Sequence, residues 1–195
     1  MTMLLGLTGS IATGKSTALA AFAAHGVPVF SADDAVHALY RDRAVPAIES
    51  LFPGTTGPEG VDRAALSRAL LADPDKLPAL EAIVHPMVRE AMAAFVKAAR
   101  ERGEPLVVLD IPLLFETGFD YGLDRVVVIH ADPEVQRARA LARPGMSVEK
   151  LEAILARQMP QAEKMARAHE LLDGSGSIAA LEAEVGALIA RLTRG

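Results

Sequence analysis

The sequence contains no cysteine, so it can form neither disulfides nor thiolate metal sites, and it has no catalytic thiol. It also contains no asparagine, and the Asn-Lys-x-Asp motif with which GTPase switches read guanine is therefore absent. The N-terminal residues lack the basic region and the long apolar region of a signal peptide. These absences exclude disulfide scaffolds and standard GTPase switches, and we expect a reducing, cytoplasmic location.

Long apolar runs and a strong positive charge are missing as well. No run approaches the roughly 18 apolar residues of a membrane span. The formal net charge of −5 argues against indiscriminate binding to nucleic acid or to anionic membranes. The 195 residues are 51% hydrophobic, enough for the core of one α/β domain with a small insert. We expect residues 1–195 to form a single domain with no membrane or nucleic-acid partner.

Short apolar segments alternate with segments of helical length. Residues 3–7 read as a buried strand, and residues 16–24 read as an alanine-rich helix. Further strands are expected at 27–30, 106–109, 125–129 and 170–172. Because helix-length segments separate the strands, the sheet should be mostly parallel and covered on both faces. The predicted fold is a doubly wound α/β domain.

Residues 44–102 depart from this alternation, because they read as almost entirely helical and show no obvious strand. Helix-breaking pairs interrupt the segment at Pro53-Gly54, Asp73-Pro74 and His85-Pro86. We interpret it as a helical insert that helps to enclose a substrate.

Three helices are expected near the C-terminus, one of them a short helix that begins at Ser147. Asp132 should cap a helix that begins at Pro133 and ends at Pro144-Gly145. Ser177 is a candidate cap of a final amphipathic helix at 178–192.

Residues 9–17 match the phosphate-loop pattern G-x-x-x-x-G-K-[ST] in full and lie between a predicted strand and a predicted helix. The candidate nucleotide-binding residues are Gly9, Ser10, Ile11, Ala12, Thr13, Gly14, Lys15, Ser16 and Thr17. Backbone N–H groups of such a loop point at phosphates, and the helix N-terminus adds partial positive charge. Lys15 would neutralise phosphate charge, and the Ser16 hydroxyl would bind Mg²⁺. The loop therefore predicts a nucleoside triphosphate, but it leaves the second substrate open.

Asp33 directly follows the strand predicted at 27–30 and thus lies at the carboxyl end of a parallel strand, where open α/β sheets bind ligands. A carboxylate there could accept a proton from an acceptor hydroxyl during phosphoryl transfer. Alternatively, Asp33 or Asp34 merely caps a helix at 35–40. Position alone leaves both interpretations open.

Arg139 and Arg143 are four residues apart on the helix predicted before Pro144, so we expect them to share one face and to grip phosphates together. Such cations would stabilise the charge that spreads over the transferred phosphoryl group. For a single arginine, a solvated surface position is the alternative.

Several short motifs together resemble the dephospho-coenzyme A kinase family. In order along the chain they are Gly6-Leu7-Thr8-Gly9, Ala32-Asp33, His85-Pro86, Pro112-Leu113-Leu114-Phe115-Glu116 and Gly174-Ser175-Gly176-Ser177. The resemblance covers essentially the whole chain and implies five parallel strands, a CoA-binding helical insert at about 44–102 and a mobile lid at about 133–160. It also implies the reaction, in which ATP with Mg²⁺ phosphorylates the ribose 3′-hydroxyl of dephospho-CoA in the last step of CoA biosynthesis.

The resemblance also implies roles for single residues. Asp33 corresponds to the general base, and Arg139 and Arg143 correspond to lid residues that contact phosphates. The segment Leu113-Leu114-Phe115 looks like part of the acceptor pocket. His85 has a minor expected role in binding the substrate, and a helix beginning at Pro86 explains the His85-Pro86 pair equally well.

Asp110 ends the strand predicted at 106–109, in a position like that of a Walker B carboxylate. It could hold Mg²⁺ directly or through water. The alternative is a hydrogen bond from the strand end to the phosphate-loop backbone, and both remain open.

The sequence departs from the family pattern at a few positions. Ser31 replaces a frequent Asp, Ser10 and Ala12 replace frequent glycines, and Gly174 replaces a frequent Asn. Because Ser31 removes one carboxylate, we assign the base to Asp33 alone. The competing functions are another small-molecule P-loop kinase and an ATP-dependent switch or binding module.

Overall fold

The computed structural model describes residues 2–194, which fold as two compact units. The first contains residues 2–30 and 99–194, and the second contains residues 31–98. None of the helices in the described chain is long and apolar enough to cross a bilayer.

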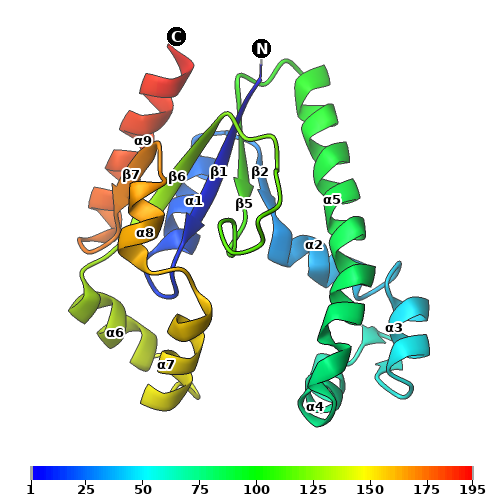
Figure 1. The fold of residues 1–195 in the computed structure, drawn as a ribbon. Coiled ribbons are helices and arrows are strands. Elements are labelled where there is room, and N and C mark those ends of the chain that lie inside the picture. The colour runs from blue at the N-terminus through cyan, green and yellow to red at the C-terminus, as the bar shows by residue number, and fades with distance from the viewer. Residues whose placement is uncertain (1, 195) are drawn as a thin grey trace. The chain divides into compact units, whose positions relative to one another are not determined.

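The first unit is built on a five-stranded sheet in the order β2-β5-β1-β6-β7, with β1 at its centre (Figure 1). Its strands are β1 (Met3–Gly9), β2 (Val29–Ser31), β5 (Leu106–Asp110), β6 (Arg125–His130) and β7 (Glu170–Asp173). The pairs β1 with β5, β1 with β6, and β6 with β7 are parallel. Every residue of β5 is buried, as expected for a strand covered on both faces. The predicted doubly wound fold with its five strands is confirmed.

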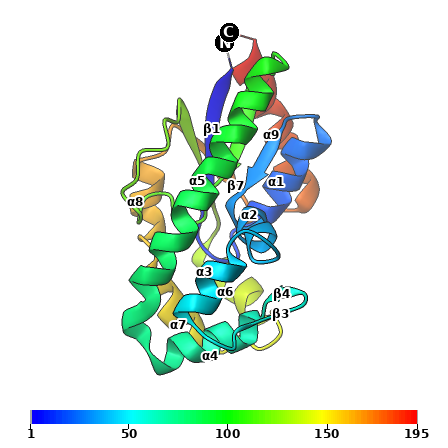
Figure 2. The same ribbon diagram turned by 90° about the vertical axis from the view of Figure 1, so that its right-hand side faces the viewer.

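Helices cover both faces of this sheet. Helices α1 (Lys15–Ala24) and α9 (Ile178–Thr193) lie side by side on one face, and α8 (Gln161–Ala166) lies on the other (Figures 1 and 2). The main core joins α1 and α9 to the strands through aliphatic side chains and Phe22. Ser177 caps α9 as predicted, because its hydroxyl accepts a hydrogen bond from the N–H of Ala180 at 3.2 Å. The sheet and its helices therefore fix where the loop after β1 begins and ends.

Two short helices, α6 (Pro133–Leu141) and α7 (Val148–Arg157), follow β6. We call residues 133–157 the α6–α7 segment. Buried Ala140 and Leu151 of this segment pack against Ala12. The helix expected to run to Pro144 is shorter than predicted, since α6 ends at Leu141.

The second unit is mainly helical, and the end of β2 leads into it. Its elements are α2 (Ala32–Leu39), α3 (Val45–Leu51), β3 (Thr56–Gly57), β4 (Gly60–Val61), α4 (Arg63–Ala72), a 3₁₀ turn (Pro74–Lys76) and α5 (Leu77–Glu101), whose last residues belong to the first unit. Side chains from α2, α3, α4 and α5 form its core. The unit begins earlier in the chain than the insert expected at 44–102, so it includes α2.

Two expectations for this segment are wrong. It does contain strands, because β3 and β4 pair as a small antiparallel hairpin next to α3 and α4 (Figure 2). Nor does a helix begin at Pro86, since α5 runs through that residue without ending. A proline inside a helix costs about 3 kcal/mol. Burial of the apolar α5 residues Leu80 and Val84 in the core offsets this cost.

Candidate active site

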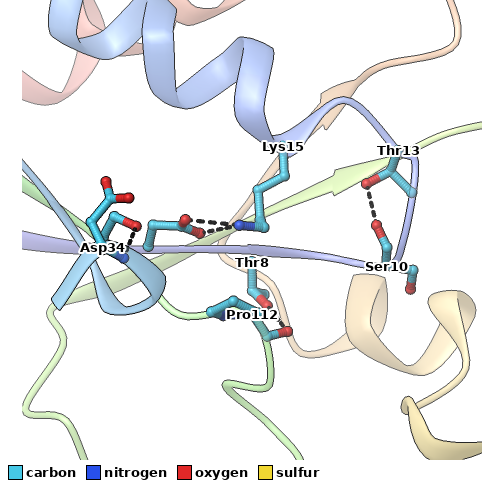
Figure 3. Close-up of polar contacts among 8 residues, drawn as sticks. Thr8, Ser10, Thr13, Lys15, Asp34 and Pro112 are labelled. Atoms are coloured by element: carbon cyan, nitrogen blue, oxygen red, sulfur yellow. Dashed lines mark hydrogen bonds and ion pairs between the residues drawn. The ribbon is translucent and has the colours of Figure 1, made fainter. Parts of the chain in front are cut away.

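The phosphate loop connects β1, which ends at Gly9, to α1, which begins at Lys15. Within the loop the Thr13 hydroxyl donates to the carbonyl oxygen of Ser10 at 2.9 Å (Figure 3). Gly14 precedes α1 with φ 103°, a conformation that favours glycine. The first N–H groups of α1 have no partners within the helix and therefore form a site for anions. The loop has the local geometry that its sequence predicts.

Ala12 explains one departure from the family pattern. Its φ is 61°, and among residues 2–194 it is the only non-glycine residue with positive φ. For an L-residue this conformation costs roughly 1–2 kcal/mol, which is why a glycine suits the position. Ala12 is 8% exposed and packs against the α6–α7 segment. Packing of the methyl group thus offsets part of the backbone strain.

Lys15 and Asp110 form an ion pair at the start of α1. The Lys15 Nζ atom lies 2.6 Å from Asp110 Oδ1 and 2.8 Å from Oδ2 (Figure 3). Sheet order brings them together, because β5 pairs with β1 and Asp110 lies opposite Leu7. The structure thus shows a contact of Asp110 with the lysine side chain of the loop, and the alternative of a hydrogen bond to the loop backbone stays open. A role of Asp110 in binding Mg²⁺ remains a prediction.

Ser16 is the second residue of α1 and is exposed, as the predicted Mg²⁺ ligand must be. Within residues 2–194, no three His, Asp or Glu side chains gather into a metal-binding group. Mg²⁺ is usually bound through few protein oxygens together with phosphates and water. The hydroxyl of Ser16 and the phosphates of a bound nucleotide fit that donor set.

Asp33 lies in the first turn of α2, in the second unit, and its side chain is exposed. The helix begins at Ala32, earlier than predicted, and its cap is Ser31. The Ser31 hydroxyl accepts a hydrogen bond from the Asp34 N–H at 3.1 Å. The alternative that Asp33 or Asp34 caps this helix is therefore wrong. Ser31, which departs from the family pattern, takes the capping role instead.

The predicted acceptor-binding residues lie in different surroundings. His85 is exposed in the middle of α5, in the second unit. Leu113 and Leu114 follow β5 in the first unit, where Leu113 is exposed and Leu114 is part of the buried core. The Arg167 guanidinium lies 5.9 Å from the centre of the Phe115 ring, within the range of a cation–π contact. Of the predicted pocket segment, Leu113 is the residue most accessible to a ligand.

The two candidate lid arginines do not share a helical face, which corrects the prediction. Arg139 is in the last turn of α6, whereas Arg143 lies in the turn after the helix. The Arg139 guanidinium donates to the carbonyl oxygens of Gly174, Ser175 and Gly176, the last at 3.1 Å. Arg139 thereby joins α6 to the loop between β7 and α9. Contact of either arginine with phosphate remains a prediction.

Gly174, another departure from the family pattern, lies against the phosphate loop. A Cβ atom at this position would be 1.9 Å from the carbonyl oxygen of Thr13. A side chain at position 174 would thus require the loop backbone to shift. Glycine at position 174 therefore leaves room for the backbone of the phosphate loop at Thr13.

Three residues around the loop and the α6–α7 segment carry no signal in the sequence, namely Gln136, Gln158 and Lys164. Gln136 and Gln158 both bond to the backbone of Ile11. Lys164, which is fully buried, forms an ion pair with Glu116 at 2.9 Å. Glu116 belongs to the Pro-Leu-Leu-Phe-Glu motif, but nothing in that motif identifies its distant partner. The contacts of the glutamines and of Lys164 depend on the tertiary fold and leave no local sequence pattern.

The family model described as dephospho-CoA kinase matches residues 3–180. A curated dephospho-CoA kinase from Brucella melitensis is 51% identical over 191 residues, which are 98% of this chain and 96% of the relative. One from Rhodopseudomonas palustris is 53% identical over 176 residues, or 90% of this chain and 88% of the relative. The range matched by the family model spans the positions of the loop, Asp33, Asp110 and both arginines.

Solved structures agree in fold. A Thermus thermophilus crystal structure has a TM-score of 0.83 and 38% identity, and covers 98% of each chain. A dephospho-CoA kinase from Campylobacter jejuni has a TM-score of 0.72 and 24% identity, and covers 100% of this chain and 99% of that chain. A shikimate kinase from Bacteroides thetaiotaomicron, at a TM-score of 0.56 and 17% identity, covers 97% of this chain and 98% of that chain.

Proposed function

The chain belongs to the dephospho-CoA kinase family, and on this premise we propose that it transfers the γ-phosphoryl group of ATP to the ribose 3′-hydroxyl of dephospho-CoA, the last step of CoA biosynthesis. The observation that carries the proposal is the family match over residues 3–180, which includes an intact phosphate loop with an oriented Lys15. We further propose that the enzyme works in the cytoplasm on this small-molecule acceptor, without a nucleic-acid partner.

The first unit supplies the groups for ATP. The loop backbone and the N-terminus of α1 bind phosphate oxygens, and Lys15 adds a fixed positive charge. When bound, Mg²⁺ would be held by the Ser16 hydroxyl and the ATP phosphates and would neutralise phosphate charge. An ammonium group has three N–H donors, so Lys15 can keep both contacts with Asp110 and still donate to a phosphate oxygen.

The acceptor would be activated by Asp33. A ribose hydroxyl is a weak nucleophile at neutral pH, and a carboxylate within hydrogen-bond reach orients it and accepts its proton. Because Ser31 already caps α2, the Asp33 carboxylate is not needed for capping. We assign CoA binding to the second unit, with a minor role for His85, and acceptor contact to the segment 113–115, chiefly to exposed Leu113.

Residues 133–160 are proposed to form a lid that brings Arg139 and Arg143 to the transferred phosphoryl group. In this proposal Arg139 also holds the loop at 174–176, whereas Arg143 lies in the exposed turn between α6 and α7. Cations at these places would stabilise the negative charge on the equatorial oxygens as transfer proceeds.

The experiment that tests the function is a measurement of ADP release from ATP·Mg²⁺ with and without dephospho-CoA. A dephospho-CoA kinase requires the acceptor for turnover, and its product carries a new 3′-phosphate. Equal ADP release in both conditions would indicate a hydrolase or switch. A panel of nucleosides and nucleotides as acceptors separates this activity from that of other small-molecule kinases.

A further inference from the structure

One residue of the phosphate loop, Ile11, is held by one side chain of the α6–α7 segment and by the side chain of the residue that directly follows this segment. The Ile11 N–H donates to Gln158 Oε1 at 3.1 Å, and Gln136 Nε2 donates to the Ile11 carbonyl oxygen at 2.8 Å. Gln136 is a buried residue of α6, and Gln158 directly follows α7. Two glutamines, one in α6 and one directly after α7, thus bond to the same loop residue.

These bonds fix the two peptide planes that flank Ile11. The N–H of Ile11 belongs to the peptide shared with Ser10, and its carbonyl belongs to the peptide shared with Ala12. The following residue, Ala12, has φ 61°, a conformation that persists only when its surroundings impose it. The apolar cluster of Ala12, Ala140 and Leu151 supplies shape but no hydrogen bonds. The two glutamines therefore supply directional constraints from outside the loop, in addition to the hydrogen bond of the Thr13 hydroxyl to the Ser10 carbonyl within it.

We propose that Gln136 and Gln158 are positioning residues that hold the phosphate loop in its ATP-binding conformation and tie it to the α6–α7 segment. Neither is assigned a contact with substrate. The proposal depends on the proposed function in one respect, because it takes ATP as the ligand of the phosphate loop. The two bonds act as one unit, which we call the Ile11 clamp.

The chemistry of the two bonds differs, which permits a sharp test. A backbone N–H can only donate and a backbone carbonyl can only accept, so position 158 must supply an acceptor and position 136 a donor. Glutamate supplies only acceptors when ionised. Gln158→Glu therefore preserves its bond to Ile11, whereas Gln136→Glu loses it. Both substitutions add one negative charge near the loop. If this charge alone mattered, the two variants would lose ATP affinity to a similar extent.

The experiment is calorimetric titration of ATP·Mg²⁺ into the wild type and the variants Gln136→Met, Gln158→Met, Gln136→Glu and Gln158→Glu. Methionine keeps the approximate length of glutamine but removes its donor and acceptor. Apparent affinity falls with the fraction of protein in the competent conformation. Losing one buried hydrogen bond can change that fraction by about tenfold. We expect each Met variant to raise the Kd for ATP about tenfold, Gln158→Glu to restore most of the loss, and Gln136→Glu to restore none.

Gln161→Glu is the matched control. Gln161 bonds to both the N–H and the carbonyl oxygen of Ala131, at 3.1 and 2.8 Å, but does not contact the loop. Its change should lower the Tm and leave the Kd for ATP within about twofold of the wild type. An equal loss of ATP affinity in Gln161→Glu would overturn the proposal, because a general loss of packing would then explain all variants.

Amide hydrogen exchange gives a second readout that does not depend on activity. The Ile11 N–H should be protected in the wild type and in Gln158→Glu, and should exchange at least about tenfold faster in Gln158→Met. An unprotected Ile11 amide in the wild type would overturn the proposal of the Ile11 clamp, even if a variant fails to fold.

The titrations can overturn the proposal as well. They do so if the Met variants bind ATP like the wild type, or if the two Glu variants have equal affinities for ATP. A wild type that binds ATP but shows no turnover dependent on dephospho-CoA refutes the proposed function and leaves the clamp to be decided by these titrations.

Discussion

The two carboxylate oxygens of Asp110 both accept hydrogen bonds from Lys15 Nζ, so the lysine of the phosphate loop is held by the last residue of the neighbouring strand. The Asp110 side chain is 4% exposed and that of Lys15 is 18% exposed. The carboxylate is therefore almost fully shielded from water, whereas the lysine side chain is partly accessible. This arrangement orients the ammonium group before ATP binds and leaves one N–H donor for a phosphate oxygen.

The pair predicts that Lys15→Met affects both turnover and stability. Turnover should fall at least about 10²-fold, because a fixed charge beside the transferred phosphoryl group is lost. The free energy of unfolding should also fall, by up to about 3 kcal/mol, because buried Asp110 loses this cation. Adding Asp110→Asn to Lys15→Met should recover stability but not turnover. Unfolding by urea and ADP release on the same preparations measure the two effects, and near-normal turnover of Lys15→Met would remove the lysine from the mechanism.

How far the sequence predicts the structure depends on how local each determinant is. The phosphate loop and β1, β5 and β6 follow from short apolar runs, glycines and polar turns, which act through neighbours in the chain. The course of α5 through Pro86 was mispredicted, because burial of Leu80 and Val84 by distant helices overrides the local cost of proline. The hairpin at 56–61 was missed because each of its strands has only two residues.

In the candidate site, too, some features follow from the local sequence and others depend on contacts between distant residues. Lys15, Ser16 and Asp110 could be selected from a motif and a strand end, but their ion pairing required the strand order β5-β1. The hydrogen bonds of Ile11 to Gln136 and Gln158 link residues more than one hundred positions apart. Residues 133–161 contain all three glutamines of the chain together with several arginines, and the sequence does not indicate which of them reach the loop. The Pro144-Gly145 pair predicts a helix that includes Arg143, whereas α6 ends at Leu141.

Replacing Arg139 and replacing Arg143 should have different effects. Of these two arginines, Arg139 alone makes hydrogen bonds through its side chain to other residues of the described chain, 2–194. Arg139→Ala should lower both the Tm and kcat, because it releases the loop at 174–176 and removes a proposed phosphate contact. Arg143→Ala should leave the Tm unchanged and lower kcat more than it raises the KM for dephospho-CoA. Thermal unfolding and steady-state kinetics distinguish the two. An unchanged kcat in Arg143→Ala would return that residue to the solvated surface.

Asp33→Asn should reduce kcat by about 10²- to 10⁴-fold, the usual contribution of a general base. Asn keeps the shape of the side chain but cannot accept the proton. Asp34→Asn is the matched control, because Asp34 lies in the same turn of α2 and is equally placed for the helix dipole. Either change should cost about 0.3–1 kcal/mol of stability by weakening that interaction. If both variants lose activity alike, the charge of the turn matters and Asp33 is not the base.

The last prediction concerns the ion pair between Glu116 and Lys164. Lys164 is fully buried, and Glu116 also accepts a hydrogen bond from the Met159 N–H at 2.8 Å, next to the end of α7. Burial raises the pKa of Glu116, but the neighbouring Lys164 ammonium and the Met159 N–H outweigh it, so the net pKa is lowered. A carboxylate whose pKa is lower in the folded state contributes stability above its unfolded pKa, about 4.3, and this stability is lost as the pH falls through the folded pKa.

Glu116→Gln should therefore cost about 3 kcal/mol at pH 7, because it leaves the Lys164 ammonium buried without its counter-charge. The difference from the wild type should stay constant between about pH 6 and pH 8 and shrink below about pH 4.3, where the wild type also loses the charge of Glu116. Glu163→Gln, at an exposed position of the same helix as Lys164, is the control and should stay within about 0.5 kcal/mol of the wild type. Urea unfolding at each pH measures the difference, and a gap that persists unchanged at pH 3 would show that Glu116 acts through packing and not through its charge.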